Sequence, residues 1–228
     1  MPPQLDNVLI FEAHQDDCAI GMGGTVLWLA NQGYNVVLVT ATKGETAYTN
    51  MDDKDRMAEI RQEEARAACE ILGIDTYEEL GRPCQGLVND RETYQEIVGL
   101  IRKYQPKYIF TQNAGDSHRD HRAISTLVEE AWWKAQERVL ADFGESFKAD
   151  ALFFYEVTNL FPNPTTIIDI TPFFENKMQA VQVFKSQLDV LQGLEDYVTG
   201  VALARGYHGH CKYGEAFLAS NFMPKNHF

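Results

Sequence analysis

The fold is decided by residues 7–24, which read NVLIFEAHQDDCAIGMGG. The first half of this stretch is an apolar run, which is typical of a strand buried inside a sheet. A histidine and two adjacent aspartates follow at once, namely His14, Asp16 and Asp17. Carboxylates and imidazoles are costly to bury unless they are paired or coordinated. The stretch therefore predicts a polar site at the end of a buried strand, and we expect that site to hold a divalent metal ion.

Strands and helices alternate along the first two thirds of the chain. Apolar and amphipathic patterns predict strands over 7–13, 35–42 and 107–112, and helices over 25–33, 55–72, 92–104 and from 119 onward. Short connections between such elements imply parallel strands joined by right-handed crossovers. Beyond residue 150 we expect strands over 151–157 and 165–170, a helix over 172–191, and a glycine-containing last stretch that can fold over the site.

These elements predict a single α/β domain over residues 1–228. Its sheet is expected to be Rossmann-like, doubly wound and mostly parallel, with helices on both faces. In such sheets ligands bind beyond the carboxyl ends of the strands. The polar residues 14–17 and a second polar cluster, residues 115–122, each follow a predicted strand at that end, so we expect the two clusters to meet.

The second polar cluster is GDSHRDHR, residues 115–122. It offers four ionisable side chains, Asp116, His118, Asp120 and His121. Two imidazoles and one carboxylate can bind zinc and leave one position open for water, and the same ligand set also suits Fe²⁺. A carboxylate that does not touch the metal is then needed to accept the proton of that water. Helix capping is the competing interpretation for the paired aspartates.

Composition narrows the partners and the compartment. The 228 residues carry a formal net charge of −13, which argues against a nucleic-acid-binding surface. No apolar run suggests a membrane span, and the first residues lack the features of a signal peptide, so we expect a cytoplasmic protein. The four cysteines have no paired spacing and are expected to be reduced thiols. A homo-oligomer stays open, with Trp132 and Trp133 in the core or at an interface.

The glycines of GMGG, residues 21–24, invite a comparison with dinucleotide-binding loops. That fingerprint needs a third glycine three positions after the second, where this chain has Val26. No acidic residue ends the second predicted strand either, since it closes with TATKG. We therefore expect these small residues to let the chain turn and the helix pack closely. A Rossmann-like nucleotide-binding module without catalysis remains the weaker alternative.

The clusters AHQDD (13–17) and HRDHR (118–122) give the chain a recognisable pattern. With TKGE (42–45), the segment 61–74 and the motifs ARG and YGEAF within 204–217, it resembles the LmbE-like or PIG-L family of metal-dependent N-deacetylases. The matches span most of the chain in the order expected for the family. The visible departure is Gln15, where the family usually has proline.

The resemblance implies a role for each matching residue. His14, Asp17 and His121 would bind zinc, with Fe²⁺ as the other metal that fits. Asp16 would be the general base that takes a proton from the metal-bound water. His118 would stabilise the oxyanion or protonate the leaving amine.

Two further roles follow from the same resemblance. Asp120 would orient one of the histidines beside it through its ring N–H. Arg61 would hold hydroxyls or an anionic group of the substrate, while Glu64 either pairs with Arg61 or faces solvent. No role follows for His208 and His210, and His227 is expected to be a tail residue.

The function implied is hydrolysis of the N-acetyl group of an N-acetylglucosamine-type amino sugar or its conjugate. The alternative within the same framework is an amidase that acts on a larger N-acyl group or a thiol conjugate. Loops 46–55, 82–91 and 158–165 are expected to choose the substrate, but their sequences do not identify it.

Overall fold

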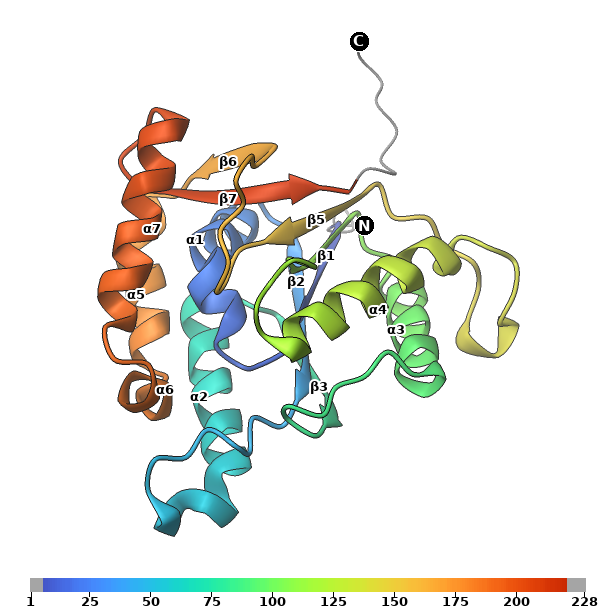
Figure 1. Ribbon diagram of the computed structural model, residues 1–228. Helices are drawn as coiled ribbons and strands as arrows, with labels where there is room; N and C mark the ends of the chain where they lie inside the picture. Colours follow the sequence, from blue (N-terminus) through green and yellow to red (C-terminus); the bar gives the residue numbers. More distant parts are fainter. Residues whose placement is uncertain (1–5, 221–228) are drawn as a thin grey trace.

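A computed structural model describes residues 6–220, which form one seven-stranded sheet with helices on both faces (Figure 1). The strand order is β3-β2-β1-β4-β5-β7-β6. In chain order the strands are β1 (Asn7–Glu12), β2 (Asn35–Thr42), β3 (Thr76–Arg82), β4 (Tyr108–Gln112), β5 (Ala151–Tyr155), β6 (Thr166–Asp169) and β7 (Gly214–Ala219). Strands β1 to β5 pair in parallel, and β7 runs antiparallel to β5 and β6. The predicted mostly parallel, doubly wound sheet is confirmed.

The helices form two layers. They are α1 (Asp17–Asn31), α2 (Met57–Leu72), α3 (Arg91–Tyr104), α4 (Arg119–Ala135), α5 (Phe174–Gln182), α6 (Lys185–Val190) and α7 (Leu194–Gly209). Helices α3 and α4 cover one face, and α1, α2 and α5 cover the other (Figure 1). Because successive strand residues point to opposite faces, Val8 and Ile10 join the core under α1 and α2, whereas Leu9 and Phe11 join the core under α3 and α4.

Helix α1 begins at Asp17, eight residues before the predicted start, so the polar cluster runs straight into the helix. The glycines of the segment allow close packing, as expected. A Cβ atom on Gly21 would lie 2.2 Å from the carbonyl oxygen of Glu156, and one on Gly24 would lie 2.6 Å from Cβ of Ile170. Real Cβ atoms do not approach other atoms so closely, so both positions exclude a side chain.

A buried ion pair holds a kink in α1. Met22 leaves the helical conformation with φ −146° and ψ 17°. The Glu215 carboxylate of β7 accepts hydrogen bonds from the backbone N–H groups of Gly24 (2.9 Å) and Thr25 (2.7 Å), where the second half of the helix starts. Lys177 of α5 lies 2.6 Å from the same carboxylate. Sequence analysis found none of these contacts, because each joins segments far apart in the chain.

Three further parts of the fold differ from the prediction. Strand β3 was not predicted, because as an edge strand it carries the half-buried, mostly polar sequence TYEELGR. The predicted helix over 172–191 is broken into a short 3₁₀ turn, α5 and α6. The last stretch forms α7 and β7, which pack against one another instead of covering the site. Trp132 is buried and Trp133 is half exposed.

The topology creates one crevice at the centre of the sheet. From β1 the chain continues to β2 and β3 on one side, and later places β4 and β5 on the other. The connections that leave the carboxyl ends of β1 and β4 therefore diverge, which is the usual ligand position in such sheets. Within residues 6–220, no helix combines the length and apolarity needed to span a bilayer.

Candidate functional site

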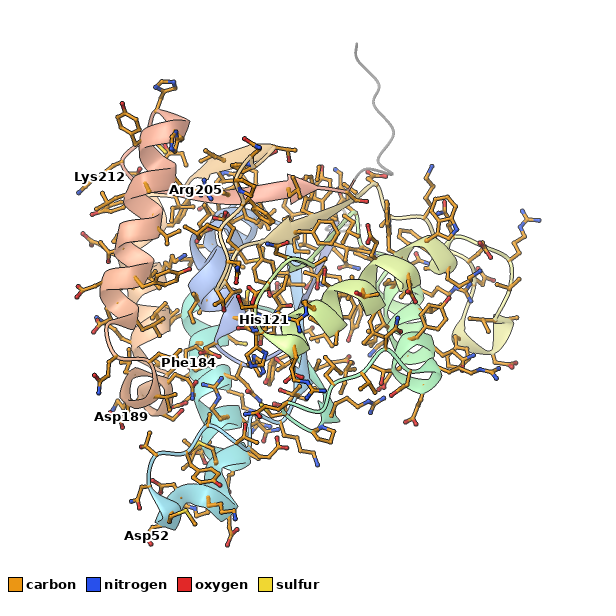
Figure 2. The ribbon with its side chains drawn as sticks, viewed as in Figure 1. Asp52, His121, Phe184, Asp189, Arg205 and Lys212 are labelled. Carbon is orange, nitrogen blue, oxygen red and sulfur yellow. The ribbon has the colours of Figure 1, made fainter. Side chains whose placement is uncertain are left out.

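Both polar clusters lie at this central crevice. His14, Asp16 and Asp17 occupy the turn between β1 and the start of α1. His118 and His121 lie at the start of α4, after β4, and Figure 2 shows His121 near the centre of the molecule. The sheet thus brings together two segments that are about a hundred residues apart in the sequence.

The three residues expected to bind the metal form a compact triangle. His14 Nδ1 lies 3.2 Å from His121 Nε2 and 3.3 Å from Asp17 Oδ2. His121 Nε2 lies 3.2 Å from Asp17 Oδ1. Atoms about 2.0–2.1 Å from a tetrahedral zinc ion are about 3.3–3.4 Å from one another. The side chains present therefore fit a zinc ion in donor chemistry and in spacing.

The electrostatics of the triangle favour added positive charge. Burial alone would lower the pKa of His121, but the carboxylates of Asp17 and Asp116 raise it to about 9. Burial likewise opposes the charge of His14, yet Asp17 and Asp120 raise the pKa of His14 well above its usual value. Burial would raise the pKa of Asp17, and the two imidazoles hold it well below its usual range. A cation can replace the protons that this cluster attracts.

Two buried aspartates orient the two imidazoles. Asp120 Oδ2 lies 3.2 Å from His14 Nε2, and Asp116 Oδ1 lies 3.2 Å from His121 Nδ1. Each ring thus has one nitrogen facing a carboxylate and the other facing the triangle, as is usual for metal-binding histidines. The Asp116 contact is at ion-pair distance only, because His121 Nδ1 makes no hydrogen bond among the described residues. The prediction for Asp120 named a neighbouring histidine, whereas the structure places its carboxylate against His14. Asp116 faces His121 instead, a role that sequence reasoning did not assign.

Asp116 is fixed by the backbone around it. Its carboxylate accepts hydrogen bonds from the N–H groups of His118 (2.8 Å), Thr158 (3.1 Å) and Asn159 (3.2 Å). Although its burial would raise the pKa of Asp116, these donors and His121 lower it. The sequence places Asp116 in the second polar cluster, which is the only indication of a role for it. Its backbone partners Thr158 and Asn159 are about forty residues away and could not be predicted.

Asp16 is held by Arg61. Its side chain makes no helix-capping hydrogen bond, so the capping interpretation fails for this residue. The Arg61 guanidinium, which is only 1% exposed, lies 2.5 Å from Asp16 Oδ1 through Nη2. Gln15 joins this contact, because its Oε1 accepts from Arg61 Nε at 3.3 Å and its Nε2 donates to the carbonyl oxygen of Thr42 at 3.1 Å. Glutamine in place of the family's proline therefore ties the turn to Arg61 and strand β2.

The remaining nitrogen of Arg61, Nη1, is buried and has no hydrogen-bond partner among the described residues. Glu64 Oε2 lies 4.0 Å from it, and both oxygens of Glu64 accept hydrogen bonds from Ser186. Glu64 therefore does not face solvent. It joins α2 to α6 and reaches Arg61 at the limit of an ion pair.

His118 begins helix α4 and faces the crevice. Its Nδ1 accepts a hydrogen bond from the backbone N–H of Asp120 at 3.2 Å, so this histidine does cap the helix. A ring that accepts at Nδ1 carries its proton on Nε2 when it is neutral. Burial and the charges of His14 and His121 lower the pKa of His118, which favours that neutral form.

A pocket of about 280 Å³ opens over the triangle. Its polar part contains the triangle, Asp16, Arg61 and His118, and its apolar part contains Ile20 of α1, Val157 just after β5, and two residues at the end of α6, Val190 and Leu191. Residues from all three loops expected to choose the substrate line it, and the α6 side chains were not foreseen. The lining residues are His14, Asp16, Asp17, Ile20, Gly44, Thr46, Ala47, Arg61, Cys84, Gln85, His118, His121, Val157, Thr158, Gln187, Val190 and Leu191. His208 and His210 are exposed at the end of α7, and His227 lies outside the described residues.

Known proteins are similar to this chain in sequence and fold. Residues 9–132 match the family described as PIG-L, GlcNAc-PI de-N-acetylase. A diacetylchitobiose deacetylase from Thermococcus kodakarensis is 31% identical over 95% of this chain and 83% of that protein. A solved structure of an N,N'-diacetylchitobiose deacetylase from Pyrococcus horikoshii has a TM-score of 0.87 at 28% identity, and the match covers 97% of this chain and 88% of that one. A 4-oxalmesaconate hydratase from Pseudomonas putida is 28% identical over 88% of this chain and 80% of its own length.

The fold, the site and these relatives define an enzyme of the metal-dependent N-deacetylase class, hydrolases that act on amide bonds. The clusters AHQDD and HRDHR both lie within residues 9–132, the part of the chain that matches the family. The chain belongs to the PIG-L family.

Proposed function

We propose that this protein removes the N-acetyl group from an N-acetylglucosamine-type sugar, with a zinc ion held by His14, Asp17 and His121. The observation that carries the proposal is the set of 3.2–3.3 Å contacts that joins His14 Nδ1, His121 Nε2 and the two carboxylate oxygens of Asp17, beneath a pocket that Asp16 and His118 also line. When bound, zinc would activate a water molecule and polarise the acetamide carbonyl. Fe²⁺ suits the same donors, so the identity of the bound metal, zinc, is itself part of the proposal.

The protein's own groups then move the protons. Asp16 accepts a proton from the attacking water, and Arg61 keeps this carboxylate aimed into the pocket. The Nε2–H of neutral His118 donates to the oxygen that becomes negative as the carbonyl carbon turns tetrahedral. The proton from Asp16 next reaches the departing amine, the C–N bond breaks, and acetate leaves.

The pocket walls support an uncharged sugar as substrate. The charge of Arg61 is paired with that of Asp16, so the guanidinium leaves no uncompensated positive charge to attract an anionic substrate. At the rim, Val190 and Leu191 are 40% and 43% exposed, and an apolar substituent on the sugar would cover them. This part of the pocket is also where a larger N-acyl group or a thiol conjugate would lie.

Release of acetate from a panel of N-acetylglucosaminides, measured with and without a chelator, tests the proposal. Asp16→Ala should keep its zinc, measured by elemental analysis, and lose at least about a hundredfold in turnover, as removal of a general base does. His121→Ala should lose zinc and turnover together. Asp142→Ala, on the exposed surface, serves as the control and should change neither. Near wild-type turnover in Asp16→Ala would show that another group is the base.

Hydration is the second candidate function, because the Pseudomonas putida relative of similar identity is a hydratase. The same zinc-loaded protein can be assayed for water addition to 4-oxalmesaconate. Hydration without acetate release from any acetylated sugar would assign the pocket to that reaction and overturn the deacetylase proposal.

A further inference from the structure

His14 takes part in a second group of metal-binding donors. Its Nδ1 faces the catalytic triangle, while its Nε2 faces Asp120 on the opposite side of the ring. His14, Cys84 and Asp120 each offer one ligand atom, and these three atoms all lie within 4.8 Å of one another. We propose that they form a second cation site, the thiol site, which takes a thiophilic divalent ion such as Cd²⁺ or excess Zn²⁺ and inhibits the enzyme.

The donor chemistry of the thiol site differs from that of the catalytic triangle. The triangle offers two imidazoles and one carboxylate, whereas the thiol site offers one imidazole, one carboxylate and one thiol. A thiolate ligand selects softer ions, so Cd²⁺ and Zn²⁺ should be bound and Mg²⁺ should not. Sulfur and nitrogen ligands of zinc lie about 2.3 Å and 2.0–2.1 Å from the ion. Donor atoms within 4.8 Å of one another are therefore near the separation that one ion requires.

The loop that carries Cys84 is tied to this place. The backbone N–H of Cys84 donates to both carboxylate oxygens of Glu45, at 3.0 and 3.2 Å, and the Thr46 hydroxyl donates to the thiol at 3.2 Å. The next residue, Gln85, has a positive φ of 61° and donates its N–H to Asp120 Oδ2 at 2.6 Å. A glutamine in the left-handed region is held there by its surroundings. The loop therefore keeps the thiol and the Asp120 carboxylate together.

An ion can reach the thiol site from the substrate pocket, because His14 and Cys84 both line that pocket. On binding, the ion forms bonds to Sγ, Nε2 and Oδ2, and the protons on Sγ and Nε2 leave to solvent. In the zinc-loaded protein the His14 ring would then be an imidazolate shared by the two ions. The ion then replaces the contact between Asp120 and His14 that orients the ring toward the triangle. Inhibition follows from that change, and it is the part of this inference that rests on the proposed function.

Cd²⁺ binding to the protein already loaded with one equivalent of zinc tests the inference. The readouts are the ultraviolet charge-transfer absorption of a Cd²⁺–thiolate bond, the metal content after gel filtration, and acetate release. We expect wild type to retain its zinc, to bind one Cd²⁺ with thiolate absorption, and to lose activity. Loss of even an outer partner of a metal ligand lowers affinity about 10–100-fold, so Cys84→Ser should weaken Cd²⁺ binding at least that much and abolish the absorption.

Cys211→Ser is the matched control, since Cys211 is also a partly exposed free thiol and lies at the far end of α7. It should behave as wild type in all three readouts. Displacement of zinc by Cd²⁺ one for one, equal binding in Cys84→Ser, or loss of the absorption in Cys211→Ser would each overturn the thiol site. Absorption and metal content decide this even if no deacetylase activity is found, so failure of the proposed function remains distinguishable.

Discussion

Replacement of Asp116 by asparagine separates the support of the triangle from the triangle itself. One carboxylate oxygen accepts from the His118 N–H and faces His121, and the other accepts from the N–H groups of Thr158 and Asn159. Asparagine keeps an acceptor on one side only, and its amide N–H₂ then meets donors on the other side. A hydrogen bond to a charged group contributes about 1.5–3 kcal/mol, so we expect the free energy of unfolding to fall by about 3 kcal/mol.

Zinc affinity should fall as well, because His121 loses the carboxylate that orients its ring. Such outer partners are worth about 10–100-fold in metal affinity. Competition with a chromophoric chelator measures this change, and urea denaturation of the metal-free protein measures stability. Asp142→Asn makes the same chemical change on the exposed surface and should alter neither. If Asp116→Asn lost stability but bound zinc as tightly as wild type, the orienting role would be refuted and Asp116 would be an anchor of the loop alone.

Other perturbations test the electrostatics and the turn. The metal-free protein should lose up to about 3 kcal/mol of stability as the pH rises from 6.5 to 9, because the pKa of His121 is about 9 in the folded protein and 6.5 in the unfolded chain. Denaturation at several pH values with a chelator present would measure this loss, and a stability that does not change with pH would contradict it. Gln15→Pro removes a hydrogen bond to Arg61 and should lower turnover about tenfold with zinc content unchanged, whereas loss of zinc would point to a collapsed turn. Lys177→Met leaves the buried carboxylate of Glu215 unpaired and should cost about 3–5 kcal/mol in thermal or chemical unfolding, a loss that a further Glu215→Gln change should partly restore.

The sheet and the meeting of the two clusters could be predicted because they depend on local patterns. Strands β1, β2 and β4 are buried on both faces and read as continuous apolar runs, and parallel connections then fix which ends face the crevice. Strand β3 lies at the edge, and its sequence is mostly polar and only partly buried, so its hydrophobic pattern carries little information. Strand β7 depends on pairing with β5 and β6, which no local pattern encodes.

The candidate site was predictable to a similar depth. Residue types and spacing indicated the triangle, but the partners behind it come from distant segments. The Asp120 carboxylate accepts hydrogen bonds from the backbone N–H groups of Gln85 and Leu87, and the Asp17 carboxylate accepts one from the side-chain amide of Gln112. Gln15 illustrates the limit most clearly. The sequence shows only that Gln15 departs from the family pattern, whereas in the structure its side chain reaches Arg61 and adds a contact that proline cannot make.

The acidic character of the site explains why it can be formed before any metal binds. Each aspartate near the triangle has its own donor: Arg61 for Asp16, Gln112 for Asp17, and backbone N–H groups for Asp116 and Asp120. Such donors fix the carboxylates in position, and although burial would raise the pKa values of Asp17, Asp116 and Asp120, these donors and the neighbouring imidazoles lower them. The two imidazoles between them then carry protons, and the ligand atoms already have the spacing that zinc requires. Metal binding at such a site exchanges protons for a cation and does not require the loops to refold, so the affinity should depend more on pH than on the stability of the fold.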